Sequence, residues 1–108
     1  MSEIDPKTFD PEHEAAMARK LLSAPNPPLQ AVTDARECCI RLALAWHQRK
    51  YQEWAPHIGA WRVRVGHDAL EAWGRVAEMK LAEADGHLSE GQLSEAKKKL
   101  LEFLAPLP

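Results

Sequence analysis

The stretch CCIRLALAW, from Cys38 to Trp46, decides the fold of this chain because it is apolar on almost every side apart from Arg41. A helix that is hydrophobic all round belongs at the centre of a bundle. Two stripes at helical spacing pass through this stretch: Ile40, Leu44, His47, Tyr51 and Trp54, and Val32, Ala35, Cys39, Leu42 and Trp46. We therefore predict a long central helix over residues 28–54 of an all-α fold, a small four-helix bundle.

A short first helix is predicted over residues 11–23, before the central one. Asp10 and Pro11 are typical of a helix start, because Asp10 can accept from an early free N–H and Pro11 lacks an N–H that would be unpaired there. Its apolar stripe is narrow: Ala15, Ala18 and Leu22, with Leu21.

Two helices follow the central one, over residues 58–84 and 89–104, so that residues 1–108 form a single helical domain. The stripe of the third is Leu70, Trp73, Ala77, Leu81 and Ala84, and Gly86 suits the left-handed position after its end. Ser89 and Gln92 have the spacing of a capping box that starts the fourth helix. The predicted buried face of that helix is Leu93, Ala96 or Lys97, Leu100, Leu101 and Leu104.

The segment around Pro56 allows two interpretations. Proline disfavours helix at the residue before it, so we predict a kink or break there. Residues 61–65 alternate with the period of a strand, but the chain has no second run to pair with them, which favours helix. If the run pairs with its own copy across a two-fold axis, the protein is a homodimer.

Length and charge narrow the classes of function. The chain has 108 residues, and its 14 Lys and Arg against 16 Asp and Glu leave a formal net charge of −2, with no surplus of positive charge for nucleic-acid phosphates. The longest uncharged apolar run, Leu42 to Trp46, is far shorter than the ~20 residues that cross a bilayer. We expect a cytoplasmic protein without membrane contact, in which the adjacent Cys38 and Cys39 are reduced thiols.

The run from Leu81 to Leu101 resembles the short C-terminal domain family. Its features are a leucine-containing helix, then Gly86, the apolar Leu88, Ser89, an acidic or amide position, and a helix with lysines and a Leu-Leu pair. Gly91 departs from the usual acidic residue. The resemblance implies a small helical hairpin associated with oligomerisation, and it implies no catalytic residue.

Neither metal nor catalytic chemistry is predicted. Zinc sites usually contain a close ligand pair such as Cys-x-x-Cys, whereas the histidines of this chain are far apart and Cys38 and Cys39 diverge on a helix. No phosphate-binding loop, nucleophile elbow or metalloprotease motif occurs. We expect no enzyme, no cofactor and no metal, and a cryptic metal or thiol protein, with a reactive Cys38 or Cys39, stays open as an alternative.

The four tryptophans are the most informative residues of the sequence for predicting core and binding positions. Trp46 and Trp73 lie on apolar stripes, which predicts core positions. Trp54 and Trp61 flank the Pro56 break beside charged residues, a composition typical of binding hot spots. The predicted partner-binding surface is Tyr51, Trp54, Trp61, Arg62 and Arg64.

The leading hypothesis is therefore a non-catalytic helical protein that binds and modulates or occludes a protein partner, such as an accessory or inhibitory protein of a phage or mobile element. The first alternative is a nucleic-acid-binding regulator that places one set of cations on a single face: Arg36, Arg41, Arg49, Lys50, Arg62 and Arg64. The second alternative is a self-associating scaffold.

Overall fold

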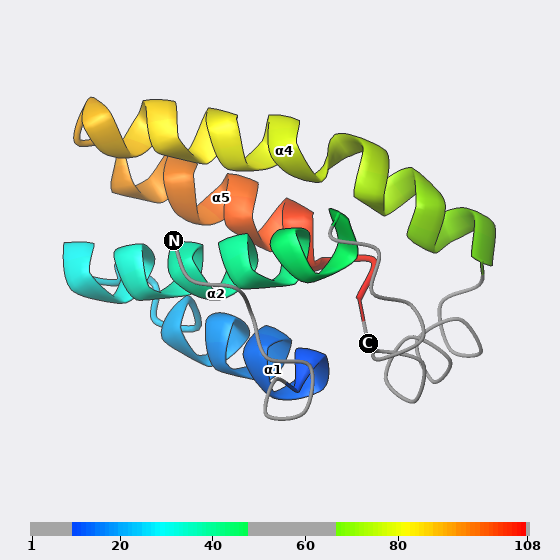
Figure 1. Ribbon diagram of the computed structural model, residues 1–108. Coiled ribbons are helices and arrows are strands. Elements are labelled where there is room, and N and C mark those ends of the chain that lie inside the picture. Colours follow the sequence, from blue (N-terminus) through cyan, green and yellow to red (C-terminus); the bar gives the residue numbers. More distant parts are fainter. Residues whose placement is uncertain (1–9, 48–66, 108) are drawn as a thin grey trace.

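The computed structural model describes residues 10–47 and 67–107 and confirms the all-α prediction. Four helices occur in these ranges, and no strand does: α1 (Pro11–Leu21), α2 (Leu29–His47), α4 (His67–Ser89) and α5 (Leu93–Leu104). They form two antiparallel hairpins, α1–α2 and α4–α5, and α2 lies between α1 and the second hairpin (Figure 1). The predicted break at Pro56, and the question of helix or strand over residues 61–65, lie outside the described residues.

Helix α1 begins as the sequence predicts. The Asp10 carboxylate accepts from the backbone N–H groups of Glu12, at 3.0 Å, and His13, at 3.3 Å. Pro11 occupies the first helical position and is buried. The N-terminal cap therefore satisfies two donors that would otherwise have no intrahelical partner.

Most core residues of α1, α2 and α4 belong to the predicted stripes, but in α2 Ile40 and Leu44 are only half-buried, and Cys38 and Ala43 are buried outside both stripes. The small residues of this core let the helices approach closely, and its members, in chain order, are Ala15, Ala18, Leu22, Val32, Ala35, Cys38, Cys39, Leu42, Ala43, Trp73, Ala77 and Ala84. Trp73 is confirmed as a core residue, with a 3% exposed side chain. Its ring packs edge-on against Phe103 of α5 at 5.2 Å between centroids, and its Nε1 donates to the Phe103 carbonyl at 2.9 Å.

The boundary between α4 and α5 corrects two predictions. Gly86 does not end the third helix: α4 continues to Ser89, and the left-handed residue is Gly91, with φ of 75°. The Gly91 N–H donates to the Leu88 carbonyl and the Gln92 N–H to the His87 carbonyl. This pair of bonds is the Schellman arrangement, in which a left-handed glycine just beyond the end of a helix lets two backbone N–H groups satisfy the last carbonyls of that helix.

The predicted capping box is also wrong. Ser89 is the last residue of α4, and its hydroxyl donates to the Gly86 carbonyl at 2.8 Å instead of capping α5. Helix α5 begins at Leu93, after Gln92, which makes no side-chain cap hydrogen bond. The Gln92 Oε1 instead lies 2.7 Å from His87 Nδ1.

The buried face of α5 differs from the predicted one at three positions, the first of which is Leu93, predicted to be buried but only half-buried. Phe103 is buried and was not predicted, whereas Leu101 is 37% exposed. The buried residues of α5 and of the turn after it are Ala96, Leu100, Phe103, Leu104 and Leu107. The buried residues Ala96, Leu100, Phe103 and Leu104 fall within an arc of about 100° around the helix, and Leu101 lies outside that arc.

Candidate functional site

The predicted partner-binding residues Tyr51, Trp54, Trp61, Arg62 and Arg64 lie outside the described residues, so that surface stays a prediction. The side chain of Trp46 is likewise not described. In the described part of the chain, a different surface has the form of a binding site.

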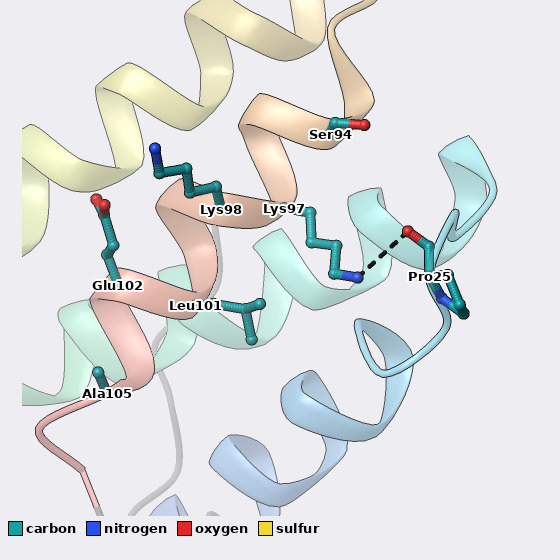
Figure 2. A pocket seen from close by; sticks show the side chains of 7 residues that line it. All are labelled: Pro25, Ser94, Lys97, Lys98, Leu101, Glu102 and Ala105. Atoms are coloured by element: carbon teal, nitrogen blue, oxygen red, sulfur yellow. Dashed lines mark hydrogen bonds between the residues drawn. The ribbon is translucent and has the colours of Figure 1, made fainter.

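This surface is an open groove along α5 with a volume of about 520 Å³. We call it the α5 groove, and Figure 2 shows the side chains that line it: Pro25, Ser94, Lys97, Lys98, Leu101, Glu102 and Ala105. Six of these residues belong to α5 or directly follow it, and Pro25 belongs to the connection between α1 and α2. The groove therefore exists because residues distant in sequence are brought together by the packing of the two hairpins.

Lys97 joins the two sides of the α5 groove. Its ammonium donates to the Ala24 carbonyl at 2.7 Å and lies 3.4 Å from the Pro25 carbonyl (Figure 2). These acceptors are neutral, so the contact fixes the position of the side chain, and its ammonium forms no ion pair with a carboxylate of residues 10–47 or 67–107. Lys98 extends to the other side of α5 and makes no ion pair within the described residues.

Glu102, the acidic member of the α5 groove, is neutralised from within the protein. Its carboxylate accepts from Lys80 at 3.1 Å and lies 3.7 Å from Lys99, which also pairs with Glu83 at 2.7 Å. The hydrogen bond from Lys80 lowers the pKa of Glu102, and the charge of Lys99 lowers it further. The local field of the groove is therefore positive, although the chain as a whole carries a net charge of −2.

Sequence reasoning missed this site because it assigned Leu101 to the core. Leu101 and Ala105 supply exposed apolar surface between the two lysines, one helical turn apart. The signal that could have found them is the spacing of Ala96, Leu100, Phe103 and Leu104, which defines a face of the helix that excludes Leu101. No sequence signal indicated that Pro25 would form the opposite wall.

Two arginines assigned to the nucleic-acid alternative form partly exposed ion pairs between helices of the bundle. Arg36 pairs with Asp85 of α4, and it lies 3.1 Å from Glu37. Arg41 pairs with Glu14 of α1 at 2.8 Å. The remaining cations of that set, Arg49, Lys50, Arg62 and Arg64, lie outside the described residues.

The two cysteines are buried free thiols in α2. Burial, together with the neighbouring Glu14 and against the opposing effect of Arg41, raises the pKa of Cys38 to about 11. Burial also raises the pKa of Cys39. A reactive thiolate needs a lowered pKa, so this environment disfavours nucleophilic or redox chemistry at both positions.

Within the described ranges, no three His, Cys, Asp or Glu side chains converge as a metal site would require. In those same ranges, no helix combines the length and apolar character needed to cross a membrane.

The comparisons with known proteins give no family to which the chain can be assigned. No family model, no curated protein and no solved structure matches it. The resemblance of residues 81–101 to the short C-terminal domain family thus stays a prediction, although these residues do form most of the α4–α5 hairpin.

Proposed function

We propose that this protein is a non-catalytic interaction module that binds a protein partner and thereby modulates or occludes it. The observation that supports the proposal is the α5 groove, where exposed apolar surface lies between two lysines that form no ion pair among the described residues. Protein-binding sites combine an apolar centre with a polar rim in this way. The raised thiol pKa values in α2 are consistent with a non-catalytic role.

The nucleic-acid alternative is less well supported. Arg36 and Arg41 would have to leave intramolecular carboxylates before they could neutralise phosphates. The self-association alternative is supported by the resemblance of residues 81–101 to the short C-terminal domain family, which is associated with oligomerisation. The α5 groove is equally available to a second copy of the chain.

The test compares capture of a partner by three forms of the tagged protein from its native lysate. Leu101→Asp places a charge in the α5 groove, and Met79→Asp makes the same kind of change on α4, where Met79 is 52% exposed and does not line the groove. Both positions are exposed, so we expect little effect on folding. Each capture is repeated after nuclease treatment and is accompanied by sedimentation of the purified protein.

The expected result is one protein that is recovered with the unmodified chain and with Met79→Asp, with or without nuclease, and is lost with Leu101→Asp. Recovery that disappears with nuclease would support the nucleic-acid alternative instead. Equal recovery with Leu101→Asp would remove the α5 groove as the binding site. A dimer that only Leu101→Asp dissociates would establish self-association.

A further inference from the structure

We infer that the α5 groove accepts an amphipathic helix of a partner protein whose apolar stripe is flanked on both sides by carboxylates. This inference rests on the proposed function and specifies the chemistry of the partner. The first argument is charge complementarity. Lys97 and Lys98 extend to opposite sides of α5, and neither forms an ion pair within the described residues, although the charge of Lys98 also acts on Glu102 (Figure 2). Glu102 is already paired with Lys80 and Lys99.

The start of α5 adds to this positive field. Gln92 forms no side-chain cap, so the first N–H groups of the helix keep no partner from the capping residue. The positive end of a helix dipole favours nearby negative charge. Glu95 of the first turn offsets part of this effect, but Glu95 does not line the α5 groove.

The second argument concerns the shape of the ligand. The exposed residues Ser94, Leu101 and Ala105 lie at intervals of seven and four along α5, which places them on one ridge of the helix. A ridge of this kind packs against the side chains of a second helix laid along it. Leu101 then meets the apolar stripe of the partner, while Lys97 and Lys98 on either side meet carboxylates, as flanking charges do in coiled coils.

A helical peptide explains the whole composition of the α5 groove better than a phosphate-bearing ligand does. Leu101 and Ala105 are apolar and would make few favourable contacts with a charged nucleic-acid backbone. The groove is also open to solvent along its length, so a small molecule would leave much of its own surface exposed, whereas buried ligands lie in enclosed pockets.

The test uses two synthetic helical peptides of about fourteen residues, a length near the minimum for a stable isolated helix. Both carry the same leucine stripe. One has glutamates on both flanks of the stripe, and the other has lysines there. Each fluorescently labelled peptide is titrated with the full chain up to about 1 mM, the weak limit of specific association. Amide chemical shifts map the contact.

Two charge reversals of the protein supply the control. Lys98→Glu changes the α5 groove, and Arg75→Glu makes the same reversal on α4, where Arg75 is exposed and does not line the groove. We expect the glutamate peptide to bind with shift changes over residues 94–105, about tenfold or more weaker with Lys98→Glu and nearly unchanged with Arg75→Glu. Lys98→Glu should also gain affinity for the lysine peptide.

Absence of binding, equal binding of the two peptides, or shift changes confined to other helices would overturn the inference. These outcomes are separable from failure of the proposed function. If Leu101→Asp abolishes capture of a partner while the glutamate peptide fails to bind, the interaction module stands and the acidic helix is wrong. If capture is insensitive to Leu101→Asp, the α5 groove is not the binding site of the captured partner, and the inference of an acidic helix in that groove is wrong with it.

Discussion

Substitution of two glycines by alanine should change stability in opposite directions. Gly86 lies inside α4, is exposed, and has nothing within 4 Å of the position that a Cβ would occupy. Alanine in a helix interior is more favourable than glycine by roughly 0.5–1 kcal/mol. Gly91 also has open space around it, but its φ of 75° requires the left-handed conformation, which costs other residues roughly 1–2 kcal/mol.

Thermal and urea unfolding measure both effects. We expect Gly86→Ala to raise the melting temperature by roughly 2–8 °C and Gly91→Ala to lower it by roughly 4–16 °C, from the usual size dependence of the unfolding entropy. Gly91→Asn should fall between the wild type and Gly91→Ala, because asparagine tolerates the left-handed region better than alanine. The sequence-based assignment, in which Gly86 ends the helix, predicts the reverse order. Destabilisation by Gly86→Ala would therefore refute the continuation of α4 to Ser89.

Three further predictions concern the core and the end of α5. Trp73→Phe removes the donor to the buried Phe103 carbonyl, and the free energy of unfolding should fall by about 1–3 kcal/mol in urea titrations; no change would mean that water replaces this bond. Arg19→Ala removes two hydrogen bonds, to the carbonyls of Leu104 at 2.7 Å and Leu107 at 2.6 Å, and should accelerate amide exchange at the end of α5. Unchanged exchange would show that these hydrogen bonds do not restrain the end of α5. Cys38 has its pKa raised by burial from 9.0 to about 11, so its contribution to stability is complete below pH about 9 and is lost as the pH rises toward about 11. Cys38→Ala should flatten that decline in urea midpoints, and an equal slope in both proteins would contradict the assignment.

The helices themselves could be predicted from the sequence because each has local signals. Asp10 and Pro11 mark the start of α1, and the apolar stripes identify the buried faces of α1, α2 and α4. The boundary between α4 and α5 could not be predicted in the same way, because two glycines five residues apart both fit the end of a helix. Backbone hydrogen bonding selects Gly91, where the Schellman pair satisfies the carbonyls of His87 and Leu88.

The candidate site could be predicted from the sequence much less well than the helices. The partner-binding surface was predicted around Pro56 because aromatic and basic residues cluster there, and the composition of a binding hot spot can be recognised from a short stretch of sequence. The α5 groove depends on Pro25, which lies far from α5 in the sequence and reaches it only through the packing of α1 and α2. Such long-range juxtaposition leaves no periodic pattern in a single sequence. The exposure of Leu101 follows from the burial of Phe103, and that choice is made by contact with Trp73.

The α5 groove is carried by a helix that other elements hold from several directions. Lys97 binds the connection after α1, Trp73 of α4 donates to the Phe103 carbonyl, and Arg19 of α1 donates to the carbonyls of Leu104 and Leu107. Salt bridges from Lys80 and Lys99 add a further link between α4 and α5. A binding surface fixed in this way loses little conformational entropy when a partner docks. A shallow groove can then bind usefully, because most of its contact energy remains available for affinity.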